Sequence, residues 1–213
     1  MPYNVLIVED QEMPRQLFEI FVHSDARFRH VGSISNADLA IDFCRLGGVD
    51  LILMDVMTGL GSSGLDAAEA IKKEFPAIRI IIVTSMPESS WLARARRIGV
   101  DSFWYKEVQK EPILEVMVRT MAGESIYPDE TPTVSIGYTN NHDFSDRELD
   151  VLRELITGDS NTEIGQRLGI APSTVKYHVR NVLQKAGCKN RGELQRKYTM
   201  ALYPQLDAAA PAE

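Results

Sequence analysis

The stretch Leu51-Ile52-Leu53-Met54-Asp55 decides the fold of this 213-residue chain. Four apolar residues lead directly into an acid, a pattern typical of a buried parallel strand that ends at a polar edge. Working outward, we expect strands near 3–8, 28–34, 50–54, 78–83 and 100–104, alternating with helices near 12–24, 36–46, 65–75, 87–98 and 110–122. This alternation predicts an α/β domain with a five-stranded, doubly wound parallel sheet.

Polar residues follow several of these strands, and their types suit phosphoryl chemistry. Glu9 and Asp10 follow the first strand, Asp55 the third, Thr84 the fourth and Lys106 the fifth. Any one of them alone fits an ordinary polar loop, but the carboxyl ends of parallel strands meet at one edge of the sheet. Carboxylates suit Mg²⁺, a lysine suits phosphate, and an aspartate can attack phosphorus. The sequence therefore predicts a magnesium-assisted phosphoryl site.

The motifs Val8-Glu9-Asp10, Met54-Asp55, Val83-Thr84-Ser85 and Lys106, with residues 99–103 before the lysine, resemble the receiver domain of bacterial response regulators over about residues 3–122. The resemblance implies that Asp55 accepts a phosphoryl group from a sensor histidine kinase. It implies a Mg²⁺ site made by Glu9, Asp10, Asp55 and the backbone carbonyl of Met57. It also implies phosphoryl-binding and switch residues, namely Thr84, Ser85, Phe103 and Lys106.

Two features of the loop after Asp55 bear on this chemistry. A magnesium-dependent phosphohydrolase of the haloacid dehalogenase type would carry a second Asp at position 57, where this chain has Met57. The loop 56–64 also departs from the receiver pattern, because it lacks the usual Met-Pro pair and is one residue longer. Its three glycines predict a mobile loop. The resemblance also implies that the residues two positions after Asp55 and Thr84, here Met57 and Met86, influence how the hydrolytic water reaches the phosphoryl group. Because neither side chain can orient a water by hydrogen bonding, we expect a phosphorylated form that hydrolyses slowly, in a protein that is not an enzyme.

Composition places the chain among soluble globular proteins, with 44% hydrophobic and 25% charged residues and room for two small domains. No targeting segment or membrane span is evident, so we expect a cytoplasmic protein that does not act at a membrane. The two cysteines, Cys44 and Cys188, suggest reduced structural thiols. A polar segment at 123–143, with two prolines and no periodicity, predicts a linker between domains.

Charge is distributed unevenly along the chain. Residues 1–143 carry 13 Lys+Arg against 21 Asp+Glu, a net of −8, whereas residues 144–203 carry 10 against 7, a net of +3. The last ten residues add −2, which gives the overall −7. Within the second part, eight basic residues follow Thr162 and face only Glu163 and Glu193. This local basic excess indicates a polyanionic partner.

Helix-capping signals organise the C-terminal part into four short helices. Three capping boxes begin at Ser145, Ser160 and Asn190, each with a glutamate three residues later. A further helix begins at Pro172, after a tight turn at Gly169. A helix, a glycine turn and a second helix at this spacing predict a helix-turn-helix.

The helix from Pro172 to about Ala186 is amphipathic. Its apolar residues, Val175, Val179, Val182, Leu183 and Ala186, share one face that must pack on a core. The opposite stripe, Ser173, Lys176, Tyr177, Arg180 and Gln184, is able to contact base edges in a major groove. Such a stripe on its own more often is a solvated face, but the basic excess and the helix-turn-helix spacing favour DNA contact.

The runs 144–152, 161–164 and 173–183 resemble the LuxR-type helix-turn-helix, and with the receiver they resemble the NarL/FixJ class of transcriptional regulators. The resemblance implies double-stranded DNA as partner, base readers at Lys176, Tyr177 and Arg180, and a phosphate contact at Thr174. His178 and Lys189 are secondary candidates. It also implies a dimerising helix at 191–203, for which Leu194, Tyr198, Ala201 and Leu202 supply an apolar stripe, and a homodimer when phosphorylated.

The resulting layout is a receiver at 1–122, a linker at 123–143, an all-α four-helix DNA-binding domain at 144–206 and a disordered tail at 207–213. Ala171 departs from the family pattern, which usually has a Ser or Thr here that caps the recognition helix. The missing cap lowers the stability of the helix by ~1 kcal/mol. The function we expect is a DNA-binding response regulator controlled by phosphorylation of Asp55. The alternative is a DNA-binding regulator whose receiver is not phosphorylated and serves dimerisation only.

Overall fold

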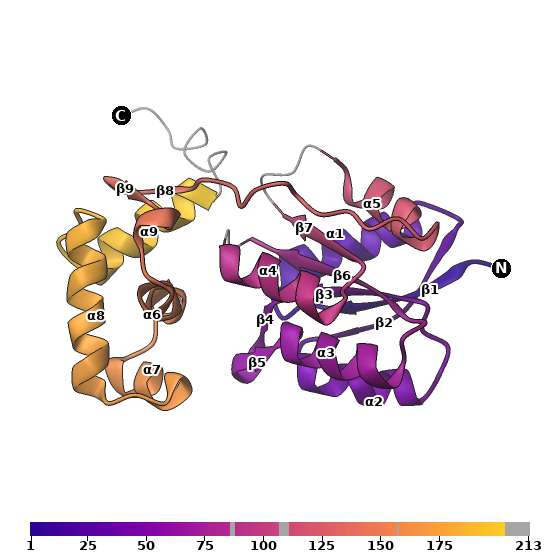
Figure 1. The fold of residues 1–213 in the computed structure, drawn as a ribbon, viewed down its shortest axis with the longest axis horizontal. Coiled ribbons are helices and arrows are strands. Elements are labelled where there is room, and N and C mark those ends of the chain that lie inside the picture. The colour runs from indigo at the N-terminus through magenta and orange to yellow at the C-terminus, as the bar shows by residue number, and fades with distance from the viewer. Residues whose placement is uncertain (86–87, 107–110, 157, 203–213) are drawn as a thin grey trace. The chain divides into compact units, whose positions relative to one another are not determined.

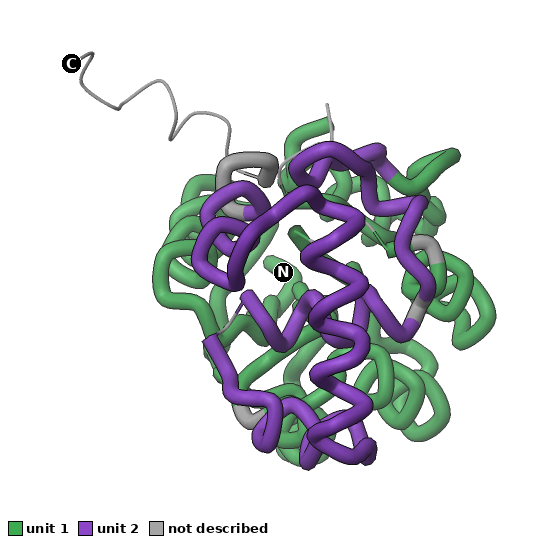
Figure 2. Tube along the Cα trace, turned by 90° about the vertical axis from the view of Figure 1, so that its left-hand side faces the viewer, with its two compact units in different colours: residues 1–131 green, residues 132–213 purple. Residues whose placement is uncertain are grey.

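The computed structural model describes residues 1–85, 88–106, 111–156 and 158–202. The chain divides into two compact units, unit 1 at Met1–Thr131 and unit 2 at Pro132–Glu213 (Figure 2). Positions 87 and 110, where two helices were predicted to begin, and the predicted tail lie outside the described residues.

Unit 1 is built on a five-stranded parallel sheet with the order β2-β1-β3-β6-β7 (Figure 1). The strands are β1 (Tyr3–Val8), β2 (Phe28–Ile34), β3 (Leu51–Asp55), β6 (Arg79–Thr84) and β7 (Ser102–Tyr105). All four pairings are parallel. The predicted α/β class and strand set are confirmed, and each strand lies within two residues of its predicted bounds.

Helices cover both faces of this sheet. One face packs against α1 (Glu12–His23) and α5 (Ile113–Met121), through side chains such as Phe18, Val116 and Met117. The other face packs against α2 (Ala40–Arg45), α3 (Gly64–Glu74) and α4 (Ser89–Ile98), with Ala68, Ile71 and Ala95 among the fully buried contacts. Alternate residues along each strand face opposite sides, so the continuous apolar runs supply both cores.

The loop after Asp55, whose glycines predict mobility, has regular structure. It forms a small antiparallel hairpin from β4 (Met57–Thr58) and β5 (Ser62–Ser63), with a 3-10 turn at Gly59–Gly61 between them. Of its three glycines, only Gly61 has a positive φ, at 74°. The hydroxyls of Thr58 and Ser62 accept hydrogen bonds from the Ala37 and Asp38 N–H groups, contacts that glycine content alone does not reveal.

The segment 123–143, predicted to be a linker, packs in two halves, one on each unit. Ile126 pairs with the edge strand β7: its carbonyl accepts a hydrogen bond from the Phe103 N–H at 2.8 Å. The Tyr127 hydroxyl donates to the Val100 carbonyl at 2.6 Å. The guanidinium of Arg96 lies 5.0 Å above the Tyr127 ring. Single apolar residues in a polar segment therefore attach it to unit 1.

The second half of that segment belongs to unit 2. It forms the hairpin β8 (Ser135–Ile136) and β9 (Thr139–Asn140), followed by a 3-10 turn at Asn141–Asp143. Val134 and Ile136 are buried, and the buried side chain of Asn141 accepts a hydrogen bond from the Val134 N–H at 2.8 Å. The C-terminal domain thus begins about twelve residues earlier than predicted, at the Thr131/Pro132 boundary.

The described part of unit 2 also contains four helices, namely α6 (Asp146–Ile156), α7 (Asn161–Leu168), α8 (Pro172–Lys185) and α9 (Arg191–Leu202). The Ser160 side chain and Glu163 form a reciprocal capping box, as predicted. Asn190 accepts from the Glu193 N–H, whereas the Glu193 carboxylate accepts from the Lys189 N–H instead of from Asn190. Gly169 ends α7 with a φ of 63°, and α8 begins after Ala171 without a side-chain cap. The predicted helix-turn-helix is confirmed.

Candidate functional site

Three carboxylates meet at the carboxyl edge of the sheet. Glu9 and Asp10 follow β1, and Asp55 is the last residue of its neighbour β3. Carboxylate oxygens of the three residues lie within 4.8 Å of one another. Glu9 and Asp55 are buried, whereas Asp10 is exposed. The topology therefore brings together acids that are 45 positions apart in the chain.

Lys106 pairs with two of these three carboxylates. It follows β7, and its N–H donates to the Thr84 carbonyl at 2.9 Å. Its Nζ lies 2.8 Å from Asp55 Oδ2 and 2.5 Å from Glu9 Oε2. The lysine side chain is only 6% exposed. Such a cation can hold two buried carboxylates close together because it offsets their mutual repulsion.

Burial and like charge shift the ionisation of these groups. Burial, and then the negative charge of Asp55, raise the pKa of Glu9 to about 7, although Lys106 acts in the opposite direction. Burial and Asp55 also raise the pKa of Asp10. Burial lowers the pKa of Lys106, but the carboxylates of Asp55 and Glu9 outweigh burial, so its pKa lies above the usual range. A bound cation would relieve the remaining repulsion among the acids.

The donor set fits a hard divalent cation. All three side chains offer carboxylate oxygens, the ligands preferred by Mg²⁺, and Mg²⁺ needs only a few protein ligands because it keeps several waters. The Met57 N–H lies 3.5 Å from Asp55 Oδ1, so the backbone of the hairpin after β3 starts beside the nucleophile candidate. The acidic cluster is therefore suitable for Mg²⁺.

The predicted switch residues lie on or directly after β6 and β7. Thr84 ends β6 and is buried, and Ser85 follows it half-buried. Phe103 is fully buried in β7, opposite Ile82. The residue paired with Thr84 is Tyr105, whose ring centroid lies 5.0 Å from that of Phe103. The arrangement places the hydroxyl-bearing Thr84 next to a buried aromatic pair.

Sequence reasoning missed Tyr105 because it reads as one more apolar strand residue. Burial raises the pKa of Tyr105 to about 12, although a hydrogen bond with the Thr131 side chain acts in the opposite direction. Phe103 also lies near Tyr127, with ring centroids 6.4 Å apart. The end of unit 1 is thus in contact with the aromatic residues at the switch positions.

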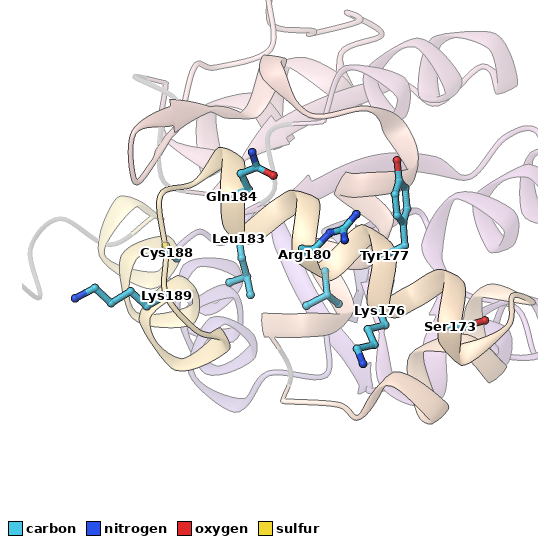
Figure 3. Close-up of a pocket in the computed structure, with 9 residues that line it drawn as sticks. Ser173, Lys176, Tyr177, Arg180, Leu183, Gln184, Cys188 and Lys189 are labelled. Carbon is cyan, nitrogen blue, oxygen red and sulfur yellow. The ribbon is translucent and has the colours of Figure 1, made fainter.

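Unit 2 presents the predicted polar stripe of α8 to solvent (Figure 3). The exposed members are Ser173, Thr174, Lys176, Tyr177, Arg180 and Gln184, while His178 is half-buried. The opposite residues Val175, Val179 and Val182 are buried, as predicted. Most of the stripe lines an open hollow of about 660 Å³, which also includes Lys189 and Cys188. Basic and hydrogen-bonding side chains therefore line the hollow together with the apolar Val179 and Leu183.

Two of these side chains contact each other. The Arg180 guanidinium carbon lies 5.5 Å from the centre of the Tyr177 ring, and the Tyr177 hydroxyl end projects from the helix (Figure 3). Such a contact restrains an otherwise flexible arginine. The His178 ring also lies near Tyr177, in an edge-on arrangement with ring centroids 5.4 Å apart.

The predicted dimerising stripe on α9 is wrong for two of its members. Leu194 is 1% exposed and Tyr198 is 3% exposed within a single copy of the chain. α9 packs against α6 and β8, so these side chains belong to the core of unit 2. The side chains of Ala201 and Leu202 lie outside the described residues. An apolar stripe predicts burial, but its partner here is the chain's own hairpin and helix.

Comparison with known proteins agrees with this architecture. Residues 5–118 match the model of the response regulator receiver domain, and residues 142–198 match the model of bacterial regulatory proteins of the luxR family. A nitrate/nitrite response regulator protein homolog of Haemophilus influenzae is 30% identical over 193 residues, covering 88% of this chain and 92% of that protein. The response regulator VraR of Staphylococcus saprophyticus is 31% identical over 199 residues, covering 90% and 93%.

Solved structures show the same fold. A structure of RcsB from Salmonella typhimurium matches with a TM-score of 0.55 at 18% identity, covering 93% of this chain and 99% of that one. RcsB bound to promoter DNA in the presence of the phosphomimetic BeF3⁻ matches with a TM-score of 0.56 at 16% identity, covering 95% and 99%. The chain therefore belongs to the bacterial response regulators that join a receiver domain to a DNA-binding domain of the LuxR family.

Among the described residues, every helix is too short or too polar to cross a membrane.

Proposed function

We propose that this protein is a transcription factor whose DNA binding is controlled by phosphorylation of Asp55 by a sensor histidine kinase. The observation that carries the proposal is the Lys106 ammonium, held 2.8 Å from Asp55 with Glu9 and Asp10 beside it. A buried nucleophile, a cation and two further acids are the groups that phosphoryl transfer to a carboxylate requires.

In the proposed reaction, an Asp55 carboxylate oxygen forms a bond to phosphorus as the bond to the donor's histidine nitrogen breaks. Lys106 pairs with the phosphoryl oxygens, and the Thr84 hydroxyl donates a hydrogen bond to one of them, in the space left by the small Ser85. When bound, Mg²⁺ would be held by Glu9, Asp10, Asp55 and the Met57 carbonyl, and it would supply positive charge that offsets the charge of the transferred group. The protein acts as phosphoryl acceptor and not as a turnover enzyme, and the apolar Met57 makes its autodephosphorylation slow.

For unit 2, we propose that α8 enters the major groove of double-stranded DNA. Its stripe is exposed over Ser173, Lys176, Tyr177, Arg180 and Gln184 and backed by a buried apolar face, and both conditions are needed for groove reading. Thr174 and Lys189 lie at the edges of the stripe and serve as phosphate contacts. His178 is half-buried and supports the helix.

Coupling between the two activities is proposed to pass through the aromatic residues of β7. Phosphorylation repositions Thr84 and Phe103, and Phe103 lies near Tyr127 in the segment that leads to unit 2. A shift of Phe103 would change how this segment is held, and thereby favour a homodimer on DNA. The partners are thus the kinase, DNA and a second copy of the chain, in the cytoplasm where the chromosome lies.

The test is intact-mass measurement after incubation with acetyl phosphate and Mg²⁺. We expect one phosphoryl adduct on the unsubstituted chain and none on Asp55→Asn, with Asp42→Asn, an exposed acid on α2, as the matched control. Equal labelling of Asp55→Asn would contradict the assignment. Absence of any adduct on the unsubstituted chain would favour the alternative of a receiver that only dimerises.

A further inference from the structure

Two buried hydroxyls hold the hairpin that follows the phosphorylation site. Thr58 and Ser62, opposite each other in β4 and β5, are each 5% exposed. Polar side chains at this depth need hydrogen-bond partners, since burying an unpaired hydroxyl is costly. Both find them in the turn between β2 and α2, more than twenty positions earlier in the chain.

Thr58 makes two hydrogen bonds. Its Oγ1 accepts from the Ala37 N–H at 2.9 Å and donates to the Ser62 carbonyl at 3.3 Å. Ala37 begins the 3-10 turn η1 (Ala37–Leu39), where a backbone N–H has no partner within the helix. Thr58 therefore closes its own hairpin and ties it to that turn.

Ser62 adds a parallel bond. Its Oγ accepts from the Asp38 N–H at 2.9 Å, an N–H that also donates to Asn36 Oδ1 at 2.8 Å. Losing the Ser62 bond would therefore leave Asp38 with a partner, whereas losing the Thr58 bond would leave the buried Ala37 N–H without the one observed here. We call the hydroxyls of Thr58 and Ser62, with these two N–H groups, the loop latch.

The latch also reaches the acid pair. The Ser35 carbonyl, at the end of β2, accepts from the Gly59 N–H at 3.0 Å, and the neighbouring Ile34 carbonyl accepts from the Glu9 N–H at 2.9 Å. A Cβ atom at Gly59 would lie 3.0 Å from the Ser35 carbonyl oxygen and 3.8 Å from Asp10 Cβ. The hairpin, the turn before α2 and the loop carrying Glu9 and Asp10 thus form one hydrogen-bonded body.

We propose that Thr58 is a positioning residue for the metal site: by tying the hairpin to the turn before α2, it fixes the backbone of Met57 relative to Glu9, Asp10 and Asp55. The inference rests on the proposed function, in which the Met57 carbonyl is a Mg²⁺ ligand. A carbonyl has no side chain to adjust, so only the backbone around it can set its position. In this glycine-rich hairpin, the latch supplies that constraint.

The experiment measures Mg²⁺ affinity of the full chain by isothermal titration calorimetry, with circular dichroism to verify folding. Thr58→Val keeps the side-chain shape and removes both hydrogen bonds, so we expect Mg²⁺ binding to weaken about 10-fold. Thr58→Ser keeps the hydroxyl and should restore the affinity of the unsubstituted chain. Thr139→Val removes a hairpin hydroxyl in unit 2, where Thr139 donates to Asp143, and should leave Mg²⁺ binding unchanged.

A second variant tests the same geometry without removing a hydroxyl. Gly59→Ala places a methyl group against the Ser35 carbonyl and should also weaken Mg²⁺ binding, even if Thr58→Val fails to fold. Its control is Gly192→Ala on α9, where an added Cβ would only reach Asn190 Oδ1 at an ordinary 3.5 Å.

The outcomes separate the latch from the metal site itself. If the unsubstituted chain binds no Mg²⁺, the metal site fails and the latch proposal fails with it. If that chain binds Mg²⁺ and both Thr58→Val and Gly59→Ala bind equally tightly, the latch proposal alone is overturned. A lower unfolding temperature with unchanged affinity would make Thr58 only a cap for the turn before α2.

Discussion

The acidic site of unit 1 and the α8 stripe of unit 2 use charge in opposite ways. Lys106, Glu9 and Asp55 are buried, and each lies in contact with another member of the set. Lys176, Tyr177 and Arg180 are exposed on a helix whose inner face forms the core. The first site is arranged before a ligand arrives, at a cost in desolvation, whereas the second keeps its charges hydrated until a partner displaces the water.

The largest expected effect tests whether the buried charges of unit 1 stabilise the fold as well as serve the phosphorylation site. Lys106→Met leaves Glu9 and Asp55 buried without their cation, so we expect a loss of about 3–5 kcal/mol in the free energy of unfolding. The matched control is Lys73→Met, because Lys73 pairs with Glu69 at 3.0 Å but is 75% exposed. Its loss should be below about 0.5 kcal/mol.

Urea denaturation without Mg²⁺ measures both variants. If Lys106→Met and Lys73→Met lower the free energy of unfolding by similar amounts, buried and exposed charges do not differ in their contribution to stability.

Intermediate effects are expected on the exposed α8 stripe, where substitution should change binding and not stability. Arg180→Ala and Lys176→Ala should each weaken binding to specific DNA by ~1–3 kcal/mol, with less loss on scrambled DNA. Lys189→Ala should weaken both DNAs alike and reduce the slope of affinity against salt by about 1, as expected for a phosphate contact.

Fluorescence anisotropy over a salt series separates base contacts from phosphate contacts. The specific DNA is selected from a random pool by its binding to the whole chain. If Arg180→Ala loses equal affinity on specific and scrambled DNA, Arg180 contacts the backbone and not a base.

The smallest effect concerns the start of α8. Ala171 gives this helix no side-chain cap, so Ala171→Ser should stabilise the chain by ~1 kcal/mol. Ala171→Val, which adds bulk without a hydroxyl, is the control in urea denaturation. If Ala171→Ser and Ala171→Val change the free energy of unfolding equally, the missing cap does not limit the stability of α8.

The residues that could be predicted from sequence are those fixed by topology. Apolar runs with an acid, a threonine or a lysine at their ends identified Glu9, Asp10, Asp55, Thr84 and Lys106, because parallel strands deliver their ends to one edge. The structure pairs Lys106 with Glu9 and Asp55, places an Asp10 oxygen within 4.8 Å of the other two carboxylates, and places Thr84 at the same edge. Amphipathic spacing likewise oriented α8 correctly.

Contacts between distant loops could not be predicted, because no pattern in the sequence indicates which loops meet. Thr58 and Ser62 look like ordinary polar loop residues, yet their hydroxyls pair with N–H groups at positions 37 and 38. Ile126 and Tyr127 are apolar residues in a polar segment, and their partners, the edge of β7 for Ile126 and the Val100 carbonyl for Tyr127, are far away in the sequence. The stripe on α9 was recognised as apolar, but periodicity does not say which surface covers it.

The central claim is that phosphorylation of Asp55 controls DNA binding. The most direct measurement compares DNA affinity of the whole chain before and after treatment with acetyl phosphate and Mg²⁺, at one salt concentration, with phosphorylation followed by intact mass. We predict that affinity rises for the unsubstituted chain and does not change for Asp55→Asn. Unchanged affinity of a fully phosphorylated chain, or an equal rise in Asp55→Asn, would contradict the claim.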